Sequence, residues 1–227
     1  MKKYIALSCL LNVSILCATP PPGPSVAVVS KVILDVRHKE IDKDWELAHR
    51  GETLASGDRV KTGDKSVAVV KFKDNSLVRI RERSELTVTG ESRNNAFSKS
   101  VNVEKGVIGF SIHKQNADEE FRFTSPTSVA SIRGTGGQFS AQTQSDTLVV
   151  IEGAVQLQNR FSSESVEVPA GFTGISNANG SITTRPSTPE ERQAAVQASR
   201  TSEQDNRLDI EFRDGQRTRK HLRIDYK

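Results

Sequence analysis

The residues with the clearest potential for ligand chemistry form a glycine-rich run, Arg133-Gly134-Thr135-Gly136-Gly137. Backbone N–H groups in such a run can cradle a phosphate when the run leads from a strand into a helix. Here the next residues, 138–141, continue as a β-prone segment, so no helix follows. The pattern therefore favours a structural corner, where glycine supplies a positive φ, over a phosphate cradle.

Other residue types that could do chemistry lack the necessary spacing. Three aspartates could offer carboxylates to calcium, but they lack the alternating acids of a calcium loop, which favours turn positions: Asp58, Asp64 and Asp74. Four histidines show no paired zinc spacing: His38, His49, His113 and His221. No Gly-x-Ser-x-Gly nucleophile motif occurs. We therefore expect no enzymatic activity, no cofactor and no metal.

Composition argues against a nucleic-acid partner. The 32 Lys and Arg residues face 28 Asp and Glu, and only 5% of residues are aromatic. This dispersed excess is too small for an electrostatic footprint on nucleic acid. Trp45 could offer a ring to a ligand, although an anchor in a strand or loop is favoured. A basic cluster could meet an anionic surface or form a solvated tail: Arg217, Arg219, Lys220 and Arg223.

The first 18 residues have the composition of a secretory signal peptide. A basic start, Met1-Lys2-Lys3, precedes an apolar run over 4–18, and residues 19–25 form a proline-rich linker. The apolar run is shorter than the roughly 20 residues of a membrane-spanning helix, so we expect no transmembrane span. The expected location is the periplasm or the cell envelope. Lipidation of Cys17 is an alternative, but Leu16 occupies a position that usually holds a small residue.

Both cysteines, Cys9 and Cys17, lie in this leader. If cleavage follows Cys17, the mature protein has no disulfide and no cysteine nucleophile.

Residues 26–184 carry the pattern of an all-β domain. Short β-prone runs alternate with Gly, Asp and Asn corners; for example, Val67–Phe72 and Leu77–Ile80 flank a hairpin turn. Two runs, 26–29 and 32–34, predict the first strands, and a turn is expected at 104–106. Gly106 and Gly153 each end a turn before an apolar run, although no fixed period emerges. The pattern predicts a compact sandwich or a short solenoid-like fold.

Residues 185–227 form a different C-terminal segment. Thr188-Pro189-Glu190-Glu191 predicts a helix start, with the helix running to about Arg200. Its alanines offer little apolar surface, so we expect it to pack weakly or lie exposed. Beyond it, apolar residues alternate with charges, which predicts a hairpin or a strand-like tail that contacts a partner: Leu208, Ile210, Phe212, Leu222, Ile224 and Tyr226.

Taken together, these elements resemble the FecR domain family over about residues 26–182. The resemblance rests on corner residues in the family's order: Gly57, Asp58, Thr62, Gly63, Pro126, Arg133, Gly134, Thr135, Gly153 and Gly171. The family's Asp-Gly-Ser-like turn reads Asp74-Asn75-Ser76 here, and Asn75 also tolerates a positive φ. We expect these residues to be structural.

The resemblance implies an all-β, partly solenoid-like domain on the extracytoplasmic side. Family members named after the ferric citrate regulator span the membrane, control sigma factors and receive a signal from an outer-membrane receptor. This sequence shows neither a cytoplasmic helical domain ahead of the β domain nor an internal span, so we do not expect a direct anti-sigma role. We expect an exported binding or sensing module that contacts an envelope protein or the cell wall. The alternative is a structural or accessory envelope protein.

Overall fold

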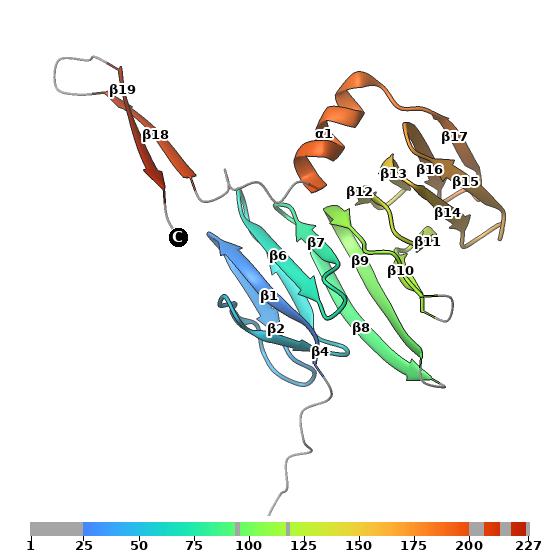
Figure 1. Ribbon diagram of the computed structural model, residues 1–227, viewed down its shortest axis with the longest axis horizontal. Helices are drawn as coiled ribbons and strands as arrows, with labels where there is room; N and C mark the ends of the chain where they lie inside the picture. The colour runs from blue at the N-terminus through green and yellow to red at the C-terminus, as the bar shows by residue number, and fades with distance from the viewer. Residues whose placement is uncertain (1–24, 94–95, 117–118, 200–206, 214–218, 226–227) are drawn as a thin grey trace, which may run out of the picture.

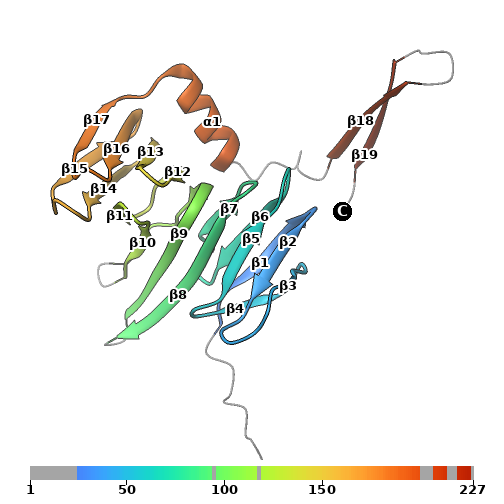
Figure 2. The ribbon, with the colours of Figure 1, turned by 180° about the vertical axis from the view of Figure 1, so that it is seen from behind.

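The computed structural model describes residues 25–93, 96–116, 119–199, 207–213 and 219–225. Most of its strands lie in two sheets that share one long strand, β9 (Ala96–Ser111). Sheet A runs in the order β4-β1-β6-β7-β9-β12-β13-β16-β17, and sheet B runs β3-β2-β5-β8-β9-β10-β11-β14-β15 (Figures 1 and 2).

The other strands of sheet A are β1 (Ser25–Ile33), β4 (Thr53–Ala55), β6 (Val67–Phe72), β7 (Leu77–Ile80), β12 (Gly136–Ala141), β13 (Ser145–Glu152), β16 (Phe172–Asn177) and β17 (Ile182–Pro186). Those of sheet B are β2 (Val36–Lys39), β3 (Glu46–Leu47), β5 (Arg59–Thr62), β8 (Glu85–Arg93), β10 (Phe121–Thr124), β11 (Ser128–Ile132), β14 (Ala154–Asn159) and β15 (Ser165–Pro169). The predicted β6–β7 hairpin is present, with Asn75 at φ +65° in its turn. The two runs expected at the start merge into β1, which contains a register shift between Val29 and Lys31.

Strand β9 passes from one sheet to the other. Its first part pairs with β8 and, in parallel, with β10. Its last six residues pair with β12, and the last four of these also pair with β7. Gly106 has φ +101°, and a Cβ there would lie 2.2 Å from the Ser84 Oγ. The predicted turn at 104–106 is therefore wrong. Glycine lets the backbone bend between sheets while the strand continues.

The core lies between the two sheets. Phe121 and Phe123 of β10 reach across from sheet B, and their ring centroids lie 4.9 Å from Phe72 and 5.0 Å from Phe110 of sheet A. Phe139 of β12 stacks on Phe123 at 6.0 Å. Along β10 and β14 the buried residues alternate with more exposed ones, as one-sided burial requires. The all-β sandwich expected from the sequence is confirmed.

Helix α1 (Pro189–Ser199) packs on the outer face of sheet A, beside β9 and β12 (Figures 1 and 2). Ala195 and Ala198 are buried. A Cβ at Gly109 of β9 would lie 1.9 Å from the Ala198 carbonyl oxygen, so the helix backbone touches the strand backbone. The expectation of a weakly packed or exposed helix is wrong. Because the side chains on both the helix and the sheet are small, the two backbones approach closely, and this close packing takes the place of a large apolar contact.

The C-terminal strands β18 (Arg207–Arg213) and β19 (Arg219–Asp225) form a separate antiparallel pair. Their register places Leu208 opposite Ile224 and Ile210 opposite Leu222. Of the two alternatives for this segment, the hairpin is the one observed. The leader and linker predictions at 1–24, and Tyr226, lie outside the described residues. No helix in the described ranges has the length and apolar character to cross a membrane.

A polar groove and the signature corners

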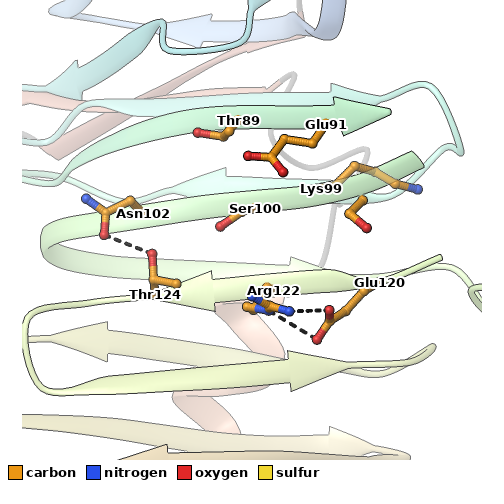
Figure 3. Close-up of a pocket in the computed structure, with 9 residues that line it drawn as sticks. Thr89, Glu91, Lys99, Ser100, Asn102, Glu120, Arg122 and Thr124 are labelled. Carbon is orange, nitrogen blue, oxygen red and sulfur yellow. Dashed lines mark hydrogen bonds and ion pairs between the residues drawn. The ribbon is translucent and has the colours of Figure 1, made fainter. Parts of the chain in front are cut away.

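A polar groove of about 530 Å³ lies on the outer face of sheet B, across β8, β9 and β10 (Figure 3). The buried residues Val88, Val101 and Phe123 alternate with the groove residues along the same strands. The pleat therefore sends one set of side chains to the core and the other to the groove. The groove is lined by Thr89, Glu91, Ser98, Lys99, Ser100, Asn102, Glu120, Arg122 and Thr124.

Strand register arranges the groove residues in cross-strand rows. Thr89 lies opposite Ser100, which lies opposite Arg122, and the next row joins Asn102 to Thr124. Residues opposite one another on neighbouring strands lie close enough to interact. The Thr124 Oγ1 accordingly donates to the Asn102 Oδ1 over 2.9 Å. The groove is thus a regular array of hydroxyl, amide and charged groups.

Two charged residues of the groove, Glu120 and Arg122, hold each other in place. The Arg122 Nε donates to the Glu120 Oε1 over 3.1 Å, and a second bond joins the Arg122 Nη2 to the Glu120 Oε2. The Ser131 hydroxyl donates to the same carboxylate over 3.0 Å. The bond from Arg122 lowers the pKa of Glu120 despite its partial burial. A bidentate pair of this kind fixes both side chains, so the groove presents a preset hydrogen-bonding pattern.

Lys99 contributes no free charge to the groove. Its Nζ donates to the Asp74 Oδ2 over 2.6 Å and to the Gln115 Oε1 over 2.9 Å, and Lys99 is only 3% exposed. Burial raises the pKa of Asp74, but bonds from Lys99, Gln115 and Ser76 outweigh burial and leave that pKa below its usual value. Asp74, expected as a turn residue, also neutralises a buried lysine.

The glycines among the signature residues lie where the chain turns between strands. Gly57, Gly134, Gly153 and Gly171 have φ values of +98°, +85°, +78° and +82°. Each of these four separates a strand of sheet A from a strand of sheet B. Gly63 lies between β5 and β6 without a positive φ; a Cβ there would lie 2.9 Å from the Asp35 Oδ2.

The polar signature residues have different surroundings. The buried Asp58 accepts from the Ala55 N–H over 2.8 Å and contacts the His38 Nε2 at 3.4 Å. The Thr62 hydroxyl accepts from the Ser84 N–H over 3.1 Å. Pro126 and Arg133 are exposed. The Thr135 Oγ1 is buried and has no hydrogen-bond partner among the described residues.

Two buried polar centres were missed at the sequence level. The Asp146 Oδ2 accepts bonds from the hydroxyls of Ser125, Thr127 and Ser128, the last over 2.6 Å. The His38 ring contacts Glu52 at 2.9 Å as well as Asp58. Only the polarity of Ser125-Pro126-Thr127-Ser128 hints at the first centre, because Asp146 is remote in sequence. Neither centre joins a hydroxyl to a histidine ring.

The remaining candidate residues stay apart from the groove. Five of the apolar tail residues lie on β18 and β19, which pair with each other: Leu208, Ile210, Phe212, Leu222 and Ile224. Trp45 is partly buried, and the Lys61 Nζ lies 4.0 Å from its ring centroid. Asp64 pairs with Arg83. Within the described ranges no three His, Cys, Asp or Glu residues gather in a way that could hold a metal ion.

Comparison with known proteins places this geometry in a family. The FecR protein family model matches residues 58–156, from the start of β5 into β14. The match is shorter than the span of 26–182 expected from the sequence, although strands outside it extend the same two sheets. No curated protein matches the chain.

Two crystal structures of a candidate anti-sigma factor from Parabacteroides distasonis, at 1.65 and 2.50 Å resolution, share the fold. Each has 14% sequence identity and a TM-score of 0.51, and the match covers 60% of this chain. The chain spans only 63% and 62% of the lengths of those two structures. The family match lies within the two-sheet fold and includes two of its four left-handed glycine corners, Gly134 and Gly153: this chain contains a FecR domain at residues 58–156.

Proposed function

We propose that this protein is an exported, non-enzymatic sensing module of the cell envelope that binds a protein partner through the polar groove of sheet B. Its FecR domain assigns it to a family of signalling or sensing modules. The signal-peptide composition of residues 1–18 supports export. In the solved structures with this fold the described role is that of an anti-sigma factor, which is also a regulatory protein.

The observation that carries the proposal is the preset hydrogen-bonding pattern of the groove. Its rows of side chains are positioned by strand register, and Arg122 is held against Glu120. Such an array suits recognition of polar groups on a partner surface, because little side-chain freedom is lost on binding.

The C-terminal hairpin is proposed as a second contact with the partner. Its candidate contact positions are Leu208, Ile210, Phe212, Leu222, Ile224 and Tyr226. An isolated two-stranded hairpin is marginally stable in water. Apolar positions that register with one another on such a hairpin therefore favour a further surface to pack on.

Site-specific photo-crosslinking in intact cells tests the groove. A photoreactive residue at Ser100, which lies between Thr89 and Arg122 in its row, should crosslink one protein partner, and Arg122→Ala should abolish that product. The same probe at Thr183, which is exposed on β17, is the matched control. Equal products at both positions, or products of wall polymer alone, would favour the structural alternative. The intact mass of the chain should correspond to a first residue between 17 and 25. A mass that still includes residues 1–16 would contradict export with cleavage.

A further inference from the structure

A second hollow, which we call the corner notch, lies away from the groove, where the end of β9 meets the β11–β12 turn. It has a volume of about 430 Å³ and is lined by residues that include His113, Lys114, Arg133, Gly134, Thr135 and Glu152. Three segments that are distant in sequence converge here. A hollow of this size can receive a small ligand or the end of a peptide.

Among the described residues, the corner notch holds two cations that make no hydrogen bond and no ion pair. Arg122, Lys99, Arg83 and Arg185 each pair with a carboxylate. In contrast, within the described ranges the side chains of Lys114 and Arg133 make neither a hydrogen bond nor an ion pair. The same holds for Glu152, the register partner of Gly136. Two cations and one carboxylate leave a net positive charge around the hollow.

Thr135 supplies an independent observation. Its side chain is 4% exposed, and its Oγ1 is buried without a hydrogen-bond partner in the described residues. An unpaired buried hydroxyl destabilises the fold, so native proteins usually satisfy it with water or a ligand. A ligand oxygen, or a water molecule held by the ligand, would supply the missing hydrogen bond to the Thr135 hydroxyl.

The backbone of the turn adds further donors. No described residue accepts a hydrogen bond from the N–H of Gly134 or Thr135. Gly134 has φ +85°, and the only heavy atom within 4 Å of a Cβ built on Gly136 is the Phe110 carbonyl oxygen, at 3.7 Å. At these two positions, therefore, no side chain covers the backbone of the turn. Backbone N–H groups left free at a left-handed turn form concavities that bind anions.

We propose that the corner notch binds an oxyanion, a carboxylate or a phosphate, held by Arg133, Lys114 and the N–H groups of Gly134 and Thr135. Glu152 opposes this charge and limits the ligand to one anionic group at a time. The turn at Arg133–Thr135 is thus both a structural corner and a ligand site. The strand β12 that follows holds this turn in place, as a helix does in a phosphate loop. This site does not depend on partner binding at the groove.

Titration followed by amide chemical shifts tests the notch directly. The probes are inorganic phosphate, acetate and a short neutral peptide with a free C-terminal carboxylate, each added to the ¹⁵N-labelled mature protein. The Gly134 and Thr135 amides should shift and saturate. A peptide that binds more tightly than acetate, and loses binding when its C-terminus is amidated, would identify a chain terminus as the source; tighter phosphate binding would identify a phosphate ester.

The variants are expected to change the affinity of the corner notch for the anion in opposite directions. Arg133→Gln should weaken binding by about tenfold or more, the value of one charge-assisted hydrogen bond, and Lys114→Gln should also weaken it. Glu152→Gln should strengthen binding. Lys105→Gln, an exposed cation six residues from Ser111 along β9, should change nothing. The proposal is overturned if Arg133→Gln and Lys105→Gln have equal effects, if Glu152→Gln weakens binding, or if the Gly134 and Thr135 amides do not respond to any probe.

Discussion

Gly134 and Gly171 have nearly the same φ, +85° and +82°, but different surroundings. A Cβ at Gly134 would lie 2.9 Å from the Lys114 Cα, whereas nothing lies within 4 Å of a Cβ at Gly171. Any side chain pays for the left-handed backbone at both positions. Only at Gly134 would the added side chain also push two backbone segments apart.

We therefore expect Gly134→Val to lower the free energy of unfolding by about 1–3 kcal/mol, the cost of a strained backbone position. Gly171→Val should cost less, because it meets no neighbouring atom. Urea unfolding of the two variants and the wild type measures the difference. Equal losses would mean that the approach of Lys114 adds nothing, and a Gly134 variant of unchanged stability would exclude a structural role for this corner.

At the residue scale the sequence predicted corners better than buried polar contacts. Gly57, Gly134, Gly153 and Gly171 follow from local composition, because a positive φ is a property of one residue. Lys99 and Asp146 do not, because their partners Asp74 and Ser125 lie in turns that are remote in sequence. The burial of a lysine beside Asp74 depends on pairing between remote strands, and no local pattern records it.

Among the elements, α1 is joined to the sheets through its first turn. The Glu191 N–H donates to the Thr188 Oγ1 over 3.2 Å, and the Glu191 Oε2 accepts from the Thr188 N–H over 2.8 Å. This reciprocal capping box satisfies N–H groups at the start of the helix. Arg185 of β17 donates to both oxygens of the same carboxylate over 2.9 and 2.6 Å. The bond from Arg185 lowers the pKa of Glu191 to about 2.

This depressed pKa predicts a dependence of stability on acid. Because the folded-state pKa lies below the unfolded value, the contribution of Glu191 is complete above about pH 4.5 and is lost as the pH falls towards 2. The carboxylate remains 25% exposed, so we expect a loss of about 1–2 kcal/mol rather than the full value of the shift. Thermal melts between pH 5 and 2.5 should show a shallower decline for Glu191→Gln than for the wild type.

Glu164→Gln, which changes an exposed carboxylate before β15, is the control and should keep the wild-type slope. If the slopes of the wild type and Glu191→Gln coincide, the capping box does not contribute to stability in solution. The start of α1 was predictable because Thr188-Pro189-Glu190-Glu191 is a local signal. Its docking was not, because that depends on Gly109, which leaves space for the Ala198 carbonyl.

Over the whole molecule, the chain crosses repeatedly between two sheets, and β9 belongs to both. The fold class was predictable from the density of short strands and corners. The continuity of β9 was not, because Gly106 has the same local signature as Gly153, yet β9 bends at the first and β13 ends just before the second. Pairing partners decide the outcome: β9 has neighbours on both sides of its bend, in sheet B before Gly106 and in sheet A after it.

The position of α1 on sheet A also decides how the C-terminal hairpin can be tested. Truncation after Pro186 would remove both the helix and the hairpin, so a loss of stability would be uninformative. Truncation after Ser199 keeps the buried Ala195 and Ala198. If the hairpin contacts a partner, this shortened chain should melt within about 2 °C of the full chain, a change below 1 kcal/mol for this size, and should lose the partner crosslinked from Ser100.

A point variant separates the apolar positions from the rest of the tail. Leu208 and Ile224 are register partners, so Leu208→Lys with Ile224→Lys places two like charges opposite each other on one face of the hairpin. The full-length double variant should match the truncated chain, with an unchanged melting temperature and no partner. If both changes instead lower the melting temperature by several degrees, the hairpin packs on its own domain, because only a contact within the folded chain contributes to its unfolding free energy in the absence of a partner.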